Sequence, residues 1–153
     1  MGEETLDVVL SLGSNLGNKE QNLKSAINHL NVRVGKVSKV SDFFKSRPWG
    51  FSSKNDFINC CCLVSTKLSI IDFISITQEI EYEMGRKRKE KTGYTDRIID
   101  IDIVFFGSQI IKSEFLTIPH QNFRKRDFVL LPLNQLSNHI DPETFISTNQ
   151  FTQ

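Results

Sequence analysis

The sequence predicts an α+β domain built on an antiparallel sheet. Runs of β-branched and aromatic residues recur along the chain at lengths typical of strands. Between them, two segments place apolar residues at the i, i+3, i+4, i+7 spacing of an amphipathic helix. In chain order these segments read strand, helix, strand, strand, helix, strand, which is the ferredoxin-like pattern. A further helical segment near the C-terminus is expected to cover the other face of the sheet and to complete three layers, α/β/α.

Length and composition indicate one ordinary globular domain. The chain has 153 residues, of which 39% are hydrophobic and 24% charged, so we expect a single domain over residues 1–153 with a polar tail from about residue 138. A net charge of +1 argues against a protein that coats nucleic acid or membranes by bulk electrostatics. No apolar run could span a bilayer and the first residues are acidic, so we expect no membrane partner and a cytoplasmic location.

The first strand and the first helix are joined by a loop of turn-forming residues. We expect the strand at Leu6–Leu12 and the loop at Gly13–Gly17. Asn18 then provides an N-cap for the helix, with Gln21 three residues later. The apolar face of this helix comprises Leu23, Ala26, Ile27 and Leu30.

Two further strands follow, separated by a turn-rich loop that carries the only tryptophan. The second strand is expected within Gly35–Phe44 and the third at Phe57–Thr66. The third contains three consecutive cysteines, Cys60–Cys62. Because neighbouring strand residues point to opposite faces, the three thiols cannot surround one metal ion. We expect them to be small, buried core residues of a protein in a reducing compartment.

The second helix is expected to open at Ser69, with Asp72 three residues on, and to stop at Gly85. A charged loop, 86–96, leads from it into the next strand. After that strand we expect a short hairpin partner at Gln109–Lys112, and then loop and helix over Phe123–Leu136.

The segment Arg97–Gly107 is the most informative part of the chain. Seven of its eleven residues are β-branched or aromatic, which predicts a buried strand. It nevertheless contains Asp100 and Asp102, which share a face of the strand with their Cα atoms roughly 6.6 Å apart. Carboxylates in apolar surroundings need a partner, and a same-sided pair suits Mg²⁺ ions that hold a phosphate chain. The alternative is that both lie near the strand edge and form salt bridges with arginines.

Phosphate groups would have to be bound by cationic side chains, since the chain has no P-loop motif. The planar fork of arginine suits phosphate oxygens. The lysines near residue 88 are better explained as a solvated charge run. The candidate arginines are Arg86, Arg88, Arg97, Arg124 and Arg126.

Four other side chains have either a structural or a ligand-binding interpretation. His120 is a structural histidine or a hydrogen-bond partner of a phosphate oxygen. Phe57 and Phe128 are core aromatics or flat faces on which a heterocycle stacks. Asn59 shares the face of Phe57 and carries a donor and an acceptor that suit the edge of a base or a pterin.

These residues alone predict a metal-dependent enzyme that acts on a nucleotide phosphate, and they leave the acceptor open. One alternative is a nucleic-acid-binding module with aromatics that stack on bases. It gives Asp100 and Asp102 no role, because carboxylates on such a face would repel phosphate. Another is a different Mg²⁺-dependent nucleotidyl enzyme on the same fold.

Six groups of residues, in their order and spacing, are more specific than any one of them. They are Leu12–Gly17, Phe57–Asn59, Gln78 with Glu81, Gly85–Arg88, Arg97–Ile103, and Leu116–His120 with Arg126–Phe128. Together they resemble the 6-hydroxymethyl-7,8-dihydropterin pyrophosphokinase family of folate biosynthesis, over about residues 6–136. That family transfers pyrophosphate from ATP to the pterin hydroxymethyl group and releases AMP. The resemblance implies the same reaction here, with ATP and the pterin as partners, two Mg²⁺ ions as cofactor, no nucleic acid and a monomeric protein.

The resemblance also implies individual roles. Catalysis would depend on Arg86, Arg97, Asp100 and Asp102, and the two aspartates would hold the metal ions. The pterin would be bound by Ser46, Arg47, Trp49, Phe57, Asn59 and Phe128. ATP would be bound by Gln78, Glu81, Arg88, Ile103, Thr117, His120 and Arg126. The loops 47–55 and 86–96 would close over the substrates and exclude water.

The chain departs from the family pattern at three places. Thr92–Asp96 stands where many relatives have Trp-Gly-Pro, and Asp127 replaces a common glycine. Phe115 stands where some relatives have an arginine that contacts ATP. None of these changes removes an implied metal ligand.

Overall fold

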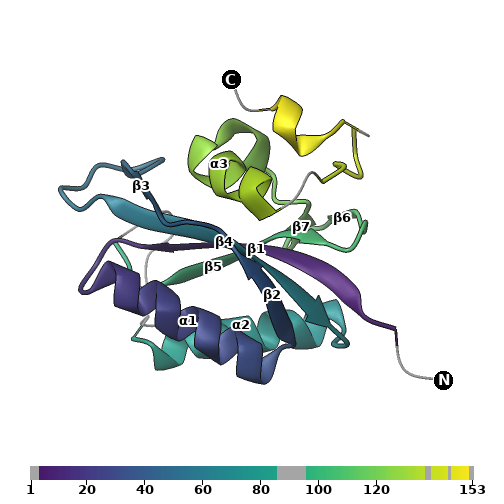
Figure 1. The fold of residues 1–153 in the computed structure, drawn as a ribbon, viewed down its shortest axis with the longest axis horizontal. Helices are drawn as coiled ribbons and strands as arrows, with labels where there is room; N and C mark the ends of the chain where they lie inside the picture. The colour runs from purple at the N-terminus through teal and green to yellow at the C-terminus, as the bar shows by residue number, and fades with distance from the viewer. Residues whose placement is uncertain (1–3, 86–95, 137–138, 145, 152–153) are drawn as a thin grey trace.

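The computed structural model of the protein describes residues 4–85, 96–136, 139–144 and 146–151. These residues form a mixed α/β domain of an antiparallel sheet and helices (Figure 1). The elements are β1 (Leu6–Ser14), α1 (Lys19–Arg33), β2 (Lys36–Val40), β3 (Phe44–Ser46), β4 (Phe57–Thr66), α2 (Ile70–Glu83), β5 (Asp100–Phe106), β6 (Ile111–Lys112), β7 (Thr117–Ile118) and α3 (Asp127–Leu136). Short 3₁₀ helices lie at Phe123–Lys125 and Thr148–Gln150.

In the described part of the chain the main sheet has five strands, with the order β2-β4-β1-β5 and with β3 also beside β4. Every pairing in it is antiparallel, and β1 lies between β4 and β5. On its β5 side, Ser11 lies opposite Asp102 and Gly13 opposite Asp100. The first strand therefore supplies the neighbours of the two carboxylates.

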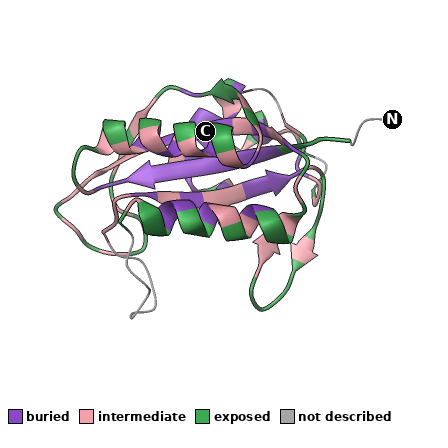
Figure 2. Cartoon of the chain, turned by 90° about the horizontal axis from the view of Figure 1, so that it is seen from below, coloured by how far each residue is buried: buried purple, intermediate pink, exposed green. Residues whose placement is uncertain are grey.

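Helices cover the sheet from both sides. Figure 1 shows α1 and α2 against one face, and α3 with the C-terminal residues against the other. The alternation of β1 divides its apolar residues between the two sides: Leu10 and Leu12 belong to the cluster under α1 and α2, and Val9 to the cluster under α3. Figure 2 shows the consequence, buried strands enclosed by helices whose outer faces are exposed.

The three cysteines lie where the sequence predicts them. All are free and buried, with Cys60 and Cys62 in the first cluster and Cys61 in the second. Burial raises the pKa of Cys60 to about 12, so its thiol stays protonated and unreactive at neutral pH. The interpretation as small core residues is confirmed.

Both helix starts predicted from the sequence are confirmed. The Asn18 side chain accepts a hydrogen bond from the backbone N–H of Gln21 (3.2 Å), and Ser69 accepts one from that of Asp72 (3.2 Å). Each cap satisfies one of the backbone donors that a helix N-terminus leaves without an intrahelical partner. Gly85, with a φ of +113°, follows α2 at the predicted stop.

Two predictions about strands need correction. The expected hairpin partner of β5, Gln109–Lys112, forms a strand only at Ile111–Lys112, and this pairs with β7. The backbone N–H of His120 bonds to the carbonyl of Val104 (3.1 Å), so a later segment occupies the outer edge of β5. In addition, the second strand, expected within Gly35–Phe44, forms at Lys36–Val40 (β2). A separate short strand, β3 (Phe44–Ser46), runs into the expected loop and pairs with the start of β4.

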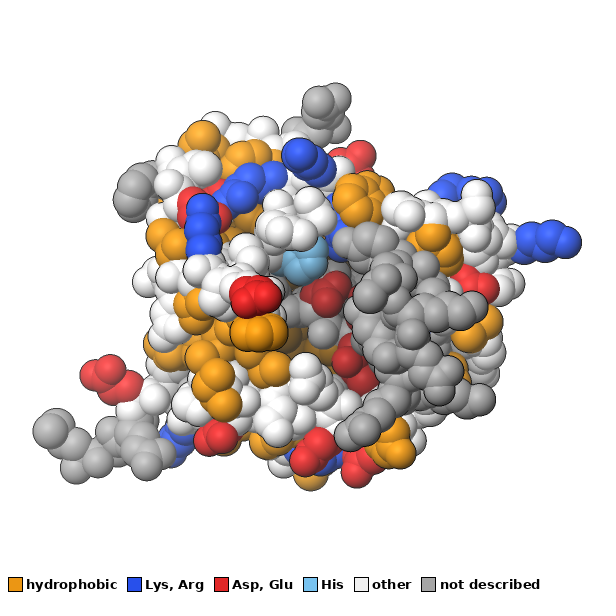
Figure 3. All heavy atoms as spheres, turned by 180° about the vertical axis from the view of Figure 1, so that it is seen from behind, with side chains coloured by type: hydrophobic (Ala, Val, Ile, Leu, Met, Phe, Trp, Pro, Cys, Tyr) orange, Lys and Arg blue, Asp and Glu red, His pale blue; other side chains and the backbone are white. Residues whose placement is uncertain are grey.

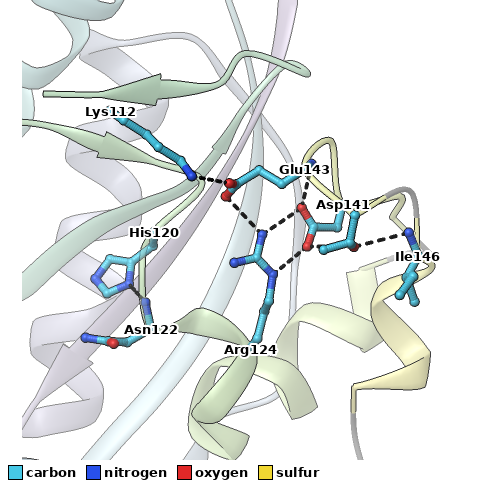
Figure 4. Close-up of polar contacts among 8 residues, drawn as sticks. Lys112, His120, Asn122, Arg124, Asp141, Glu143 and Ile146 are labelled. Carbon is cyan, nitrogen blue, oxygen red and sulfur yellow. Dashed lines mark hydrogen bonds and ion pairs between the residues drawn. The ribbon is translucent and has the colours of Figure 1, made fainter.

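The residues after α3 are more than a polar tail. Asp141 is fully buried and accepts hydrogen bonds from Arg124, one of them 2.9 Å long. Glu143 forms ion pairs with Arg124 (3.1 Å) and with Lys112 of β6 (2.7 Å). Figure 4 shows the Arg124 guanidinium between the two carboxylates. These ion pairs fasten residues 139–144 to the β6 strand and to the 3₁₀ turn at 123–125.

Among the described residues, no helix has the length and the apolar character needed to cross a membrane.

Candidate active site

Two cavities meet at the carboxylates of β5. The first, of about 50 Å³, lies over β1, β3 and β4, and the second, of about 540 Å³ and more open, lies between α2, β5 and the β6–β7 hairpin. Three side chains line both of them: Arg97, Asp100 and Asp102. Figure 3 shows acidic side chains and a histidine gathered at a hollow in the surface, with hydrophobic side chains beside them. Two ligands, one bound in each cavity, would therefore have adjacent ends at these three side chains.

The electrostatics of the carboxylate pair favour a bound cation. Arg97 forms an ion pair with Asp100 (3.1 Å), so part of the salt-bridge alternative is present. Removal from water, together with the nearby carboxylates of Asp100 and Glu81, raises the pKa of Asp102 well above its usual value, although Arg126 opposes the shift. A divalent cation would relieve this repulsion, and oxygen ligands are those that Mg²⁺ prefers.

The number of protein ligands also fits Mg²⁺. Within the described residues no group of three or more His, Cys, Asp or Glu side chains is arranged to hold a metal. Mg²⁺ is commonly held by one or two carboxylates, with phosphate oxygens and water in its other positions. The pair of Asp100 and Asp102 is a donor set of that kind.

The backbone of Arg97 is fixed by Asn15, a buried residue in the loop after β1. The Asn15 side-chain oxygen accepts from the N–H of Arg97 (2.7 Å), and the Asn15 N–H donates to the Arg97 carbonyl (3.1 Å). Its amide nitrogen donates to Asp96 (2.7 Å) and to the carbonyl of Asn55 (3.2 Å). The Asn55 amide also donates to Asp96 (3.1 Å). This Asn15 cluster, Asn15 with Asn55, Asp96 and Arg97, joins the loops after β1 and before β4 to the start of β5.

Hydrogen bonds hold the carboxylate of this cluster in its charged form. The bond from Ser53, reinforced by those from Asn15 and Asn55 and opposed by partial burial, lowers the pKa of Asp96. The carboxylate is therefore ionised at neutral pH and serves as the common acceptor for the surrounding donors.

Aromatic side chains form the walls of the first cavity. Phe51 and Phe57 meet edge to face with their ring centroids 6.2 Å apart. The buried Arg126 places its guanidinium carbon 4.2 Å from the centroid of the Trp49 ring and 5.4 Å from that of Phe128. These are cation–π distances. The cavity thus offers flat apolar faces beside a buried cation, which suits a flat heterocycle.

Asn59 is held in one orientation at the floor of this cavity. Its amide nitrogen donates to the carbonyl of Phe44 (3.2 Å) and to the hydroxyl of Ser46 (2.7 Å). Both amide hydrogens are thereby used within the protein, and the amide oxygen is the group that can accept from a ligand. A Cβ at Gly13 would lie 3.0 Å from this oxygen, so the glycine gives the amide the room that it occupies.

His120 supplies a neutral donor in the second cavity. Its Nδ1 accepts from the backbone N–H of Asn122 (3.2 Å, Figure 4), so the proton of the neutral ring is on Nε2, 4.0 Å from an oxygen of Asp102. Burial and the positive charge of Arg126 lower the pKa of His120 to about 4. At neutral pH the ring is therefore uncharged and presents Nε2–H toward the carboxylates.

Most residues predicted from the sequence line one of the two cavities. The six predicted for the pterin all line the first: Ser46, Arg47, Trp49, Phe57, Asn59 and Phe128. Of those predicted for ATP, the second cavity is lined by Gln78, Glu81, Ile103, Thr117 and His120. Arg126 lines the first cavity instead, where Trp49 and Phe128 hold its guanidinium. Arg86 and Arg88 lie outside the described residues, and Arg124 lines neither cavity because Asp141 engages it.

Several lining residues were given no binding role from the sequence. In the first cavity these are Ser11, Gly13 and Phe51, and in the second they are Ile74, Thr77, Ile101 and Leu116. Phe115, which also lines the second cavity, was noted only because some relatives have an arginine that contacts ATP at its position. Gly13 was expected in the loop after the first strand, but β1 extends to Ser14, and a glycine inside a strand is a sign of close approach by another group. The others depend on strand register and helix rotation, which local patterns do not reveal.

Comparisons with known proteins agree with the resemblance noted from the sequence. Residues 9–138 match the family model described as 7,8-dihydro-6-hydroxymethylpterin-pyrophosphokinase (HPPK). A Porphyromonas gingivalis protein named 2-amino-4-hydroxy-6-hydroxymethyldihydropteridine pyrophosphokinase is 41% identical over 138 residues, covering 89% of this chain and 94% of that protein. A Bacillus subtilis protein of the same name is 34% identical over 143 residues, covering 92% and 84%.

The fold has solved counterparts. A crystal structure of wild-type Plasmodium falciparum HPPK-DHPS with pteroate superposes with a TM-score of 0.77 at 16% identity. The match covers 99% of this chain and 44% of that one, so the present chain spans less than half of the Plasmodium protein. The likeness at this identity concerns the fold alone. The family model and the relatives above establish that the chain belongs to the 7,8-dihydro-6-hydroxymethylpterin-pyrophosphokinase family.

Proposed function

We propose that this protein transfers pyrophosphate from ATP to the hydroxymethyl group of 6-hydroxymethyl-7,8-dihydropterin and releases AMP, a reaction of folate biosynthesis. The observation that carries the proposal is the position of Asp100 and Asp102, which line an aromatic cavity and an open cleft at the same time. A transfer between two substrates needs a junction, a place where their reacting ends meet, and here the junction is the pair of carboxylates shared by the two cavities. The names of the curated relatives describe the same activity.

The first cavity is assigned to the pterin. The rings of Phe57 and Phe128 would enclose the flat heterocycle, and the oxygen of Asn59 would accept a hydrogen bond from its polar edge. Ser46, Arg47 and Trp49 complete the wall on the β3 side. Arg126, buried at the inner end of this cavity, is close enough to Asp102 and His120 to influence both of their pKa values.

The second cavity is assigned to ATP. Gln78 and Glu81 of α2 face Ile103 of β5 and Thr117 of β7 across it. The Nε2–H of His120 is a donor for a phosphate oxygen near the carboxylate pair. We propose that Asp100 and Asp102 hold two Mg²⁺ ions, which would neutralise the phosphate chain and orient it for in-line displacement.

In this reaction the group passes directly from one substrate to the other, so the protein has to position the reactants and stabilise charge. The pterin hydroxyl oxygen forms a bond to the β-phosphorus, the bond from that phosphorus to the α–β bridging oxygen breaks, and AMP leaves with this oxygen while the hydroxyl proton is released. Arg97, fixed by Asn15 and paired with Asp100, would offset negative charge on the transferred group. Holding both reactants next to each other at the junction would supply the rest of the rate acceleration through proximity.

We further propose that the domain, residues 1–153, has the three-layer ferredoxin-like arrangement. The strand order β2-β4-β1-β5 and the position of α1 and α2 opposite α3 support this assignment. We also propose that the protein acts as a monomer. Three free thiols and ATP as substrate are consistent with the cytoplasm.

The test is product analysis of the purified protein with ATP, 6-hydroxymethyl-7,8-dihydropterin and Mg²⁺. We expect AMP and pyrophosphorylated pterin in equal amounts. Asp100→Asn should lower kcat by about 100-fold or more, on the scale of losing a main electrostatic contribution to the transition state. The control is Asp72→Asn, which changes an exposed carboxylate that lines neither cavity, and which should leave kcat unaltered.

Three outcomes would contradict the proposal. AMP formed without pterin would indicate a different nucleotide enzyme. Absence of turnover in protein shown to be folded by its thermal transition would favour a binding module. Equal loss of activity in both variants would remove the special role of the carboxylate pair.

A further inference from the structure

The loop 47–56 forms one wall of the first cavity. It connects β3 to β4, and its residues Arg47, Trp49 and Phe51 line the cavity. Because the loop lies outside the paired strands of the sheet, its shape depends on contacts with other segments. If the loop had to be ordered whenever a ligand binds, the lost conformational entropy would subtract from the affinity. The groups that hold the loop therefore help to determine how tightly the cavity binds.

The carboxylate of Asp96 accepts hydrogen bonds from two side chains of this loop. The Asn55 amide donates to one of its oxygens (3.1 Å), and the Ser53 hydroxyl donates to the carboxylate as well. The Ser53 oxygen in turn accepts from the backbone N–H of Asn55 (3.1 Å), which closes a turn within the loop. Ser53 and Asn55 are half-buried, whereas their neighbours Ser52 and Lys54 are exposed. The turn thus directs both polar side chains inward, onto a single acceptor.

Asp96 can hold the loop without holding the reacting groups. It lines neither cavity. The next residue, Arg97, has its backbone N–H and carbonyl bonded to Asn15 (2.7 and 3.1 Å), and these bonds do not involve the Asp96 carboxylate. If the carboxylate is removed, the Asn15 amide keeps the carbonyl of Asn55 as an acceptor (3.2 Å). The loop and the Arg97 backbone are therefore fixed by separate groups.

Two aromatic rings would transmit a change in the loop to a bound ligand. The Phe51 ring meets that of Phe57 edge to face, with the centroids 6.2 Å apart. The Trp49 ring lies 4.2 Å from the guanidinium carbon of Arg126. Phe51 and Trp49 both belong to the loop and line the cavity, so a loop released from Asp96 would shift the cavity wall.

We infer that Asp96 is a positioning residue for the pterin. It holds the loop 47–56, through Ser53 and Asn55, in the shape that forms the cavity before the ligand arrives. The identity of the ligand rests on the proposed function. Asp96 ends the segment Thr92–Asp96, at which the chain departs from the family pattern, so the resemblance does not imply this role. A hydrogen bond to a charged group corresponds to a factor of about 10 to 100 in an equilibrium constant. A released loop would weaken pterin binding by a factor of that order.

The first measurement needs no ligand. Hydrogen–deuterium exchange compares the amides of the loop 47–56 in wild type and in Asp96→Ala, and we expect exchange to be faster by about tenfold or more in the variant. Asp42→Ala is the matched control, because the Asp42 carboxylate accepts a bond of the same kind from the Gln135 amide (3.1 Å) and lines neither cavity. Unchanged exchange in Asp96→Ala, or an equal increase in both variants, would overturn the inference.

The second measurement separates binding from catalysis. Trp49 is the only tryptophan of the chain and lies in the loop, so quenching of its fluorescence reports pterin binding. We expect Asp96→Ala to raise the Kd and the KM of the pterin about 10- to 100-fold, with kcat and the KM for ATP unchanged. Asp42→Ala should alter none of these constants. A fall in kcat as large as the rise in KM would overturn the positioning role.

Reversing the hydrogen-bonded pair tests the mechanism. Asn55→Asp alone places two carboxylates against each other and should weaken pterin binding at least as much as Asp96→Ala. With Asp96→Asn added, the amide at position 96 donates to the carboxylate at position 55 and still presents an oxygen to Ser53. Pterin binding should then recover to within about threefold of wild type.

The outcomes distinguish this inference from the proposed function. A double variant that keeps the melting temperature of wild type but does not recover pterin binding would overturn the role of Asp96. Equal pterin binding by wild type and Asp96→Ala would also overturn that role and would leave the proposed function intact. A wild-type protein that binds no pterin would overturn the proposed function, whereas the exchange measurement would still decide whether Asp96 holds the loop.

Discussion

Replacing Asn15 by alanine tests how strongly the loops around the site depend on one buried side chain. The substitution removes hydrogen bonds to the Arg97 N–H (2.7 Å), to Asp96 (2.7 Å) and to the Asn55 carbonyl (3.2 Å). A buried polar group left without its partner costs about 1–3 kcal/mol. Since Asp96 retains donors from Asn55 and Ser53, we expect a total of about 3 kcal/mol. For a domain of this size that lowers the melting temperature by about 6–12 °C.

The measurement is urea unfolding followed by the fluorescence of Trp49, with thermal unfolding as a second probe. Asn15→Asp keeps the acceptor for the Arg97 N–H but places a second carboxylate against Asp96, so it should be at least as destabilising as alanine. Adding Asp96→Asn to it should recover at least half of the loss, because an amide at position 96 can donate to the new carboxylate and accept from Asn55. A cost below about 1 kcal/mol for Asn15→Ala, or a double variant no more stable than Asn15→Asp, would refute the reasoning.

Two further substitutions test the cavity floor and the C-terminal ion pairs. Gly13→Ala would bring a methyl group to 3.0 Å from the Asn59 oxygen and should raise the KM for the pterin by about tenfold, less than the 100-fold attributed to a 1 Å misplacement, with the KM for ATP unchanged in steady-state assays. Burial acts to raise the pKa of Asp141, but hydrogen bonds, chiefly from Arg124, hold it below its usual value. The stability this adds is complete above the unfolded pKa of about 3.9 and is lost as the pH falls through the lower folded value. The difference in melting temperature between wild type and Asp141→Asn should therefore shrink below about pH 4, and a constant difference down to pH 2.5 would contradict this.

Local patterns were sufficient for much of the fold. The caps at Asn18 and Ser69 depend on residues three apart in sequence, and both formed as predicted. The strand Phe57–Thr66 has the predicted bounds. The shared face of Asp100 and Asp102 follows from the period of two in any strand.

Features that depend on distant pairings could not be predicted in this way. The register that places Ser11 opposite Asp102 is decided by the packing of the whole sheet. Arg126 lies in the aromatic cavity because Trp49, far away in sequence, provides the ring beneath its guanidinium. The pairing of Arg124 with Asp141 likewise exists only once α3 has turned the chain back.

The wall shared by the two cavities has a thermodynamic consequence. Because Arg97, Asp100 and Asp102 line both cavities, a change in their charge or position caused by a ligand in one cavity would alter the binding of a ligand in the other. Linkage then requires that the factor by which Mg-ATP changes the dissociation constant of the pterin equals the factor by which the pterin changes that of Mg-ATP. Cooperativity between the substrates would thus be a property of three side chains, and substitutions elsewhere in either cavity would alter one affinity while leaving the coupling factor intact.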